Sequence, residues 1–132
     1  MILLCSVLLF MPHKGTHAEA MAVCIEVAQA AEAADEDPAL LVSLAYVESR
    51  LHRGAVSKAG AVGPLQVLPR FWPGDPVLAG IKAWKYWTGR TNSVRDGIAA
   101  YNAGKRAGPR AFRHADRVLQ LAEKIRGWAS GD

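Results

Sequence analysis

The 132-residue chain has few of the residues that define several protein classes, and each shortage excludes one of them. Two cysteines are too few for a disulfide-rich miniprotein, and the four histidines are too scattered for zinc-ligand spacing. No metal site and no cofactor are therefore predicted. The 12 glycines and 7 prolines are too few for a collagen-like or long disordered chain. Hydrophobic residues make up 51% of the chain, which at this length suits one domain with a short leader.

The charges are nearly balanced, with a mild basic excess. The sequence has 16 Lys and Arg against 12 Asp and Glu, a net charge of +4. This balance suits an anionic polymer as partner, whereas the basic residues Lys105, Arg106, Arg110 and Arg113 also fit a solvated helix face. No DNA- or RNA-binding motif accompanies them, so nucleic acid is not predicted as a partner. The small size predicts a monomer.

The chain opens on an uncharged, mostly apolar run from Ile2 to Met11. This run is shorter than the ~20 residues of a membrane-spanning helix. It fits the core of a secretory signal peptide, and Ala18-Glu19-Ala20 has the small residues of a cleavage site. The sequence thus predicts a signal peptide over 1–20, a domain over 21–132, and export to the periplasm or cell wall. After such cleavage Cys24 would be a lone, buried apolar residue. The alternative is a buried N-terminal helix or strand, because no Lys or Arg precedes the run.

From residue 21 onward the pattern is helical. Helices are predicted over 22–34, 38–51, 77–88, 93–104 and 111–126, with a loop over 52–64 and a short helical turn over 65–68. Asp37 is placed to cap the second helix with Pro38 at its first position, and Ser93 to cap the fourth. No stretch alternates as a strand does, so the fold class is a small all-α domain.

Glu48 is the most informative residue. Leu41, Leu44, Ala45 and Leu51 share its helix face at 3.6 residues per turn, so Glu48 lies on an apolar stripe. Burial disfavours the charged form of a carboxylate and raises its pKa, which suits a general acid. The alternative is a Glu at the helix end that turns to solvent or pairs with a neighbouring Arg or Lys.

Three motifs that follow one another along the chain favour the general-acid interpretation of Glu48. Glu48-Ser49 closes a helix, Gly63-x-x-Gln66 follows a glycine-rich loop, and Ala100-Tyr101-Asn102-Ala103-Gly104 comes later in the chain. Together they resemble the catalytic domain of the soluble lytic transglycosylases, in the goose-type lysozyme superfamily. The resemblance implies a small lysozyme-like helical domain with a cleft. It further implies cleavage of the β-1,4 bond between N-acetylmuramic acid and N-acetylglucosamine in peptidoglycan, leaving a 1,6-anhydromuramoyl end.

The resemblance also implies roles for single residues. Glu48 matches the catalytic acid/base. Ser49 is expected to bind near the acetamido group or to position Glu48, and Gln66, Tyr101 and Asn102 to line the cleft. Trp72 is the candidate sugar platform, whereas Trp84 and Trp87 suit core packing. His114 stands where family members often carry a tyrosine, and we expect it on the closing wall of the cleft. Pro64 departs from the family pattern and removes a backbone donor from the expected cleft wall.

The spacing of the acids favours a single-carboxylate reaction. Most glycosidases need two carboxylates across the bond, and no Asp or Glu lies between Glu48 and Asp75. Asp75 and Asp96 are the remaining partners for hydrolysis, although a turn residue beside Pro76 and a helix N-terminal cap are the favoured explanations of these two residues. The alternatives are thus a goose-type lysozyme-like hydrolase and an inactive peptidoglycan-binding or structural component. The expected context is wall remodelling, or a secretion, conjugation or phage assembly.

Overall fold

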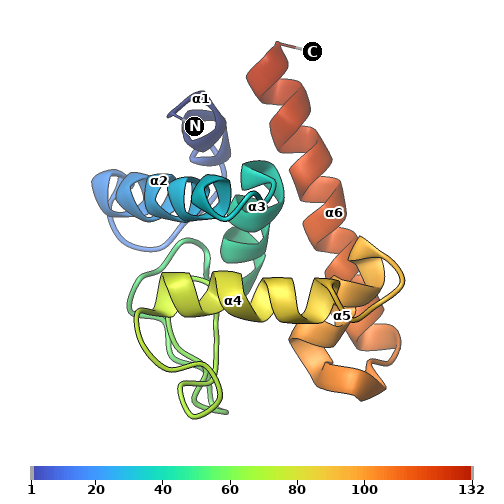
Figure 1. The fold of residues 1–132 in the computed structure, drawn as a ribbon. Coiled ribbons are helices and arrows are strands. Elements are labelled where there is room, and N and C mark those ends of the chain that lie inside the picture. The colour runs from blue at the N-terminus through green and yellow to red at the C-terminus, as the bar shows by residue number, and fades with distance from the viewer. Residues whose placement is uncertain (1, 132) are drawn as a thin grey trace.

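The computed structural model describes residues 2–131 and is helical throughout that range, apart from its loops and two isolated β-bridges (Figure 1). The predicted all-α class is confirmed. The elements are α1 (Ile2–Leu8), α2 (His17–Ala33), α3 (Pro38–Ser49), α4 (Pro76–Thr88), α5 (Val94–Ala103), the 3₁₀ turn η1 (Gly104–Arg106) and α6 (Pro109–Ser130).

Capping residues set where the helices begin. The Asp37 side chain accepts from the Ala39 N–H at 2.9 Å with Pro38 in the first turn, and Ser93 caps α5, both as predicted. Helix α2 starts earlier than the expected residue 22. Thr16 and Glu19 form a reciprocal capping box that fixes its first turn.

The N-terminal segment is packed into the domain. Cys5 of α1 and Cys24 of α2 form a disulfide, and Cys5 and Leu8 are fully buried. The structure therefore has the alternative to a signal peptide, in which the N-terminal segment is a buried helix. Cys24 is paired with Cys5 rather than alone. Cleavage after Ala20 stays a prediction.

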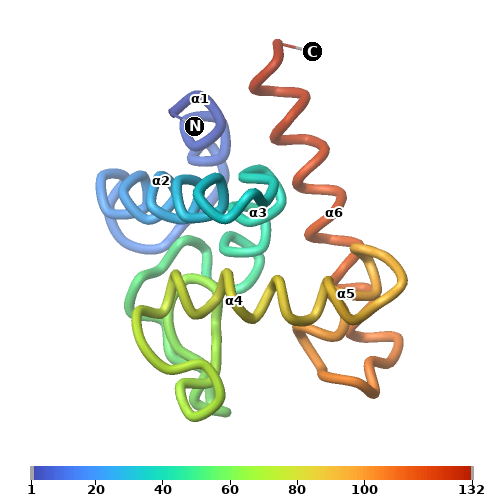
Figure 2. The backbone as a smooth tube through the Cα atoms, viewed as in Figure 1, coloured from blue at the N-terminus to red at the C-terminus, as the bar shows by residue number. Residues whose placement is uncertain are grey.

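The longest helix, α6, runs along one side of the molecule, where it packs against α5, α3 and α1 (Figure 1). Helices α2 and α4 run across the molecule with α3 beside them (Figure 2). The core between the helices is aliphatic, and its largest fully buried side chains include Leu41, Leu44, Leu65, Ile98, Val118 and Ile125. Its aliphatic surface supplies the main driving force for folding.

The loop between α3 and α4 is closed by bridges rather than by the helical turn expected over 65–68. Val62 pairs with both Val56 and Val67, and residues 63–66 form a turn. Gly63 has a φ of +82°, and a Cβ there would lie 2.6 Å from the Pro76 side chain. Only glycine fits this point, where the loop passes close to the start of α4.

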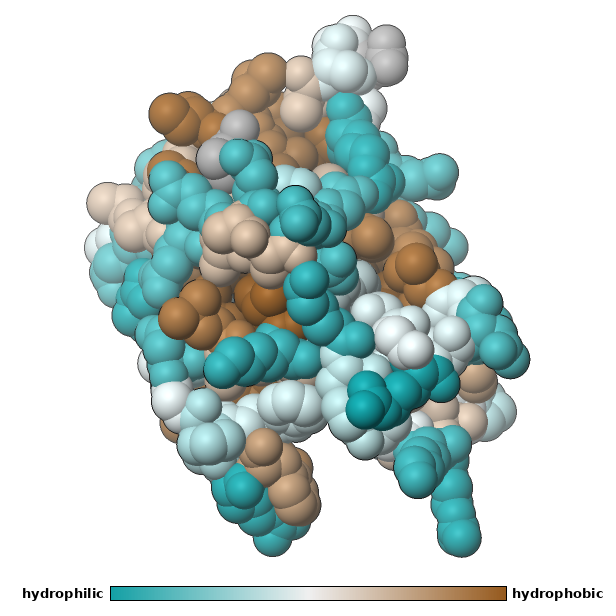
Figure 3. Space-filling model, viewed as in Figure 1, coloured by the Kyte–Doolittle hydropathy of each residue, from teal (hydrophilic) through white to brown (hydrophobic). Residues whose placement is uncertain are grey.

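Hydrophobic side chains also gather on the surface over α1 (Figure 3), where Ile2 and Leu3 are mostly exposed.

None of the helices described in residues 2–131 is both long enough and apolar enough to span a membrane.

Candidate active site

Glu48 lies in the last turn of α3, at the inner end of a cavity. Its side chain is only 12% exposed. The helix ends directly after it, because Arg50 and Leu51 take the left-handed conformation with φ of 57° and 62°. This conformation is unusual for side-chain-bearing residues, and it ends α3 one residue after Glu48, which lines the cavity. The predicted alternative, pairing with a neighbouring cation, does not occur: Arg53 pairs with Glu26, and Arg50 donates to Tyr46.

The cavity has a volume of about 530 Å³, within the usual range of small-molecule sites. It brings together five of the predicted residues, Glu48, Gln66, Trp72, Tyr101 and Asn102. They come from α3, the loop that follows α3, and α5, so separate parts of the chain build one site. The cavity is further lined by Ser57, Ala59, Ala61, Val67, Leu68, Phe71, Ala83, Trp87, Ala100, Ala103 and Gly104.

Hydrogen bonds to the loop backbone fix two of the lining residues. Gln66 has a φ of +55°, and its side-chain amide donates to the carbonyls of Ala55 and Gly63. Tyr101 donates its hydroxyl to the Leu65 carbonyl at 2.5 Å. Both residues therefore tie the loop to the cavity wall, and their apolar or amide surface is left to face a ligand.

Ser49 lies outside the set of residues that line the cavity. Its hydroxyl donates to the carbonyls of Ala45 and Pro64 and accepts from the His52 N–H. Pro64 is buried and does not line the cavity either, so its missing N–H is not at the cavity wall. Ser49 thus anchors the loop directly behind Glu48.

His114 lies on α6 behind Glu48 rather than on the cavity wall. Its Nε2 is 3.3 Å from Oε1 of Glu48, and its side chain is 8% exposed. The two atoms are within contact distance but are not aligned, so Nε2 has no hydrogen-bond partner among the described residues. Leaving a buried polar atom such as Nε2 without a hydrogen bond costs about 1–3 kcal/mol of folding free energy.

Burial determines the electrostatics of the site. It raises the pKa of Glu48 to about 7, and the nearby Arg117 guanidinium opposes the rise. Burial likewise lowers the pKa of His114, with a further decrease from Arg117, and it raises the pKa of Tyr101. At neutral pH Glu48 therefore exists in both protonation states, as a residue must that first gives and then takes a proton.

The family model of the transglycosylase SLT domain matches residues 26–73, a segment that includes Glu48, the end of α3 and the loop that carries Gln66 and Trp72. Over this segment the chain is similar to the transglycosylase SLT domain. The matched segment covers roughly a third of the chain and ends before α5, which carries Tyr101 and Asn102. No curated protein and no solved structure matches the chain.

The candidate site has one acidic group. Glu48 is the only carboxylate among the described residues that line the cavity. Asp75 caps α4 by accepting from the Leu78 N–H, and Asp96 lies in the first turn of α5. The residues that the structure describes also include no group of three His, Cys, Asp or Glu side chains placed to hold a metal ion.

Aromatic residues also line the cavity, among them Phe71, Trp72 and Trp87. Trp72 stacks edge-on against Tyr86, which does the same with Trp87. Trp84 is buried in the core and donates to Glu36, as its expected packing role requires. Trp87 differs from its expected packing role, since it is part-exposed and lines the cavity. The sequence gives no indication that Trp87 lines the cavity, because the position of the loop that forms the rest of the cavity cannot be predicted from helical periodicity.

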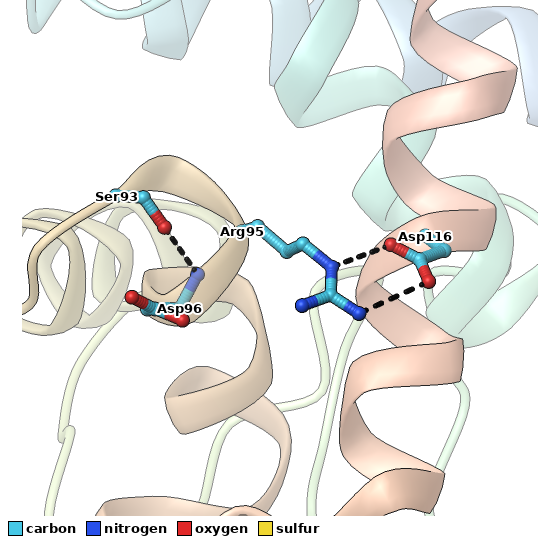
Figure 4. A network of polar contacts seen from close by, with 4 residues as sticks. All are labelled: Ser93, Arg95, Asp96 and Asp116. Carbon is cyan, nitrogen blue, oxygen red and sulfur yellow. Dashed lines mark hydrogen bonds and ion pairs between the residues drawn. The ribbon is translucent and has the colours of Figure 1, made fainter.

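An ion pair holds α5 against α6 (Figure 4). Arg95 donates to both carboxylate oxygens of Asp116, at 2.7 and 3.3 Å. At the start of α5 the Ser93 hydroxyl accepts from the backbone N–H of Asp96. The bidentate pair lowers the pKa of Asp116. Tyr101 and Asn102 of α5 line the cavity together with Glu48, whereas His114 of α6 contacts Glu48 without lining the cavity.

Proposed function

We propose that this chain is an exported peptidoglycan lytic transglycosylase in which Glu48 is the single catalytic acid/base. The family supports a peptidoglycan substrate in general terms. The observation that carries the finer proposal is the one buried carboxyl group, with a pKa of about 7, at the end of a cavity lined by no other described carboxylate.

The proposed reaction has two steps. Protonated Glu48 gives its proton to the glycosidic oxygen, the bond to the anomeric carbon breaks, and the acetamido oxygen of the substrate closes onto that carbon. Ionised Glu48 then takes the proton of the 6-hydroxyl group as its oxygen displaces the acetamido oxygen. No water is consumed, so the product is a 1,6-anhydro sugar, and Glu48 returns to its protonated form.

The remaining cavity residues would bind the glycan. Trp72 and Trp87 offer aromatic faces for sugar stacking, and Asn102 is an exposed amide at the rim. Gln66 and Tyr101 would shape the subsite, because their polar groups already bind the loop backbone.

Export is supported by the Cys5–Cys24 disulfide, since disulfides persist in oxidising compartments such as the periplasm. The wall substrate lies in the same compartment.

The test is mass spectrometry of fragments released from purified peptidoglycan. We expect products lighter by one water than reducing muropeptides, and a loss of at least about a thousandfold in rate for Glu48→Gln, since the amide cannot donate or accept the reacting proton. Glu123→Gln, an exposed change on α6, is the matched control. Reducing products would instead support the lysozyme-like hydrolase. Binding without products would support a structural component.

A further inference from the structure

The imidazole of His114 is a polar group buried against Glu48 that the proposed reaction does not yet use. Its Nε2 lies 3.3 Å from Oε1 of Glu48, both side chains are almost fully covered, and Nε2 has no hydrogen-bond partner in the described chain. Buried polar atoms in folded proteins nearly always have a partner. Oε1 of Glu48 is close enough to Nε2 to serve as one.

The position of His114 excludes direct contact with sugar. It was expected on the closing wall of the cleft, but it is 6% exposed and is not among the residues that line the cavity. It can therefore act on the substrate only through Glu48.

We propose that His114 is a positioning residue for Glu48, whose Nε2–H donates to Oε1 and thereby leaves Oε2 as the oxygen that carries the reacting proton. The proposal rests on the proposed function. Rotation about the last torsion of Glu48, which is broad for carboxyl groups, aligns the bond. The same donor then serves both steps, because Oε1 accepts whether Glu48 is protonated or ionised.

The groups that surround the pair fit this arrangement. Arg117 of α6 lowers the pKa values of both Glu48 and His114, and Glu48 in turn raises the pKa of Tyr101 of α5. Burial and Arg117 both favour the neutral imidazole, and a neutral ring has a single N–H to give. Since Nε2 faces the carboxyl group, the hydrogen belongs on Nε2.

Two variants separate donation from packing. His114→Gln keeps an N–H donor that does not titrate, whereas His114→Phe keeps an aromatic ring without a donor. We expect His114→Gln to retain the wild-type alkaline limb of kcat/KM, near pH 7, and activity within about tenfold. His114→Phe should lower kcat about 10- to 100-fold and move the limb to higher pH, because the ionised carboxylate loses its donor.

The outcomes distinguish this proposal from the proposed function. An inactive wild-type protein would contradict the function itself. An active wild type in which the Phe and Gln variants share one pH profile would overturn the role of His114 alone. Nitrogen-15 spectra of wild-type His114 at pH 8 give a second test that needs no variant. Hydrogen on Nε2 is expected, and hydrogen on Nδ1 would overturn the proposal.

Discussion

At the scale of single residues, the site depends on a carboxyl group that the fold keeps in an unfavourable environment. The pKa of Glu48 is raised from 4.5 to about 7, so the folded state holds its proton more tightly than the unfolded state does. The stability of the native protein is therefore highest below about pH 4.5, as far as this residue is concerned, and decreases as the pH rises through about 7.

We accordingly expect Glu48→Gln to stabilise the protein at alkaline pH while abolishing turnover. The advantage of the variant over wild type should grow by up to about 3 kcal/mol between pH 4.5 and 8.5, since one pKa unit corresponds to about 1.4 kcal/mol. Urea unfolding of both proteins at the two pH values measures it, and Glu123→Gln should show no such growth. A constant difference between Glu48→Gln and wild type would mean that Glu48 is not desolvated.

At the scale of elements, the site depends on how closely α4 approaches the loop that follows α3. A Cβ at Gly80 would lie 2.5 Å from the Leu65 side chain, and the carbonyl of Leu65 holds the Tyr101 hydroxyl. Gly80 thus lets the helix and the loop pack together at a point that supports the cavity.

We expect Gly80→Ala to destabilise the domain by about 1–3 kcal/mol, the usual cost of overpacking, despite the better helix propensity of alanine. Activity should decrease as well, because displacement of Leu65 moves Tyr101. The matched control is Gly127→Ala in α6, where an added Cβ meets nothing within 4 Å and should stabilise by up to about 1 kcal/mol. Equal effects of the two substitutions on thermal unfolding would contradict the close packing at Gly80.

The elements also show how far sequence reasoning extends. Local signals such as Asp37, Pro38 and Ser93 predict helix starts correctly, because a cap acts on its own helix. The motif residues Glu48, Gln66, Tyr101 and Asn102 were correctly grouped into one cavity. The positions of Ser49 and His114 outside the cavity were not predictable. They follow from how the loop after α3 and helix α6 pack, and no periodicity in the sequence indicates that packing.

At the scale of the whole molecule, the disulfide joins the N-terminal helix to the rest of the domain. Cys5 and Cys24 are separated by 19 positions, and both are fully buried beside the core. A covalent link of this span restricts the unfolded chain, which raises the relative stability of the folded state.

Reduction of the disulfide is expected to lower the free energy of unfolding by about 2–4 kcal/mol. Chemical denaturation with and without dithiothreitol measures the change, and a Cys5→Ala, Cys24→Ala double variant should be insensitive to the reductant. Thiol titration of the unfolded protein without reductant should find no free thiol. Two titratable thiols there would contradict the link.

The burial of Ala20 has a consequence for the order of events in the proposed export. Ala20 is fully covered in α2, and a peptidase needs its substrate in an extended form, so cleavage after Ala20 can only precede folding of that helix. Processing and folding therefore compete in time. A chain that is cut first loses α1, the Thr16 cap and the partner of Cys24, whereas a chain that folds first keeps all three and hides the cut site. The length of the mature protein would therefore show whether cleavage or folding was faster.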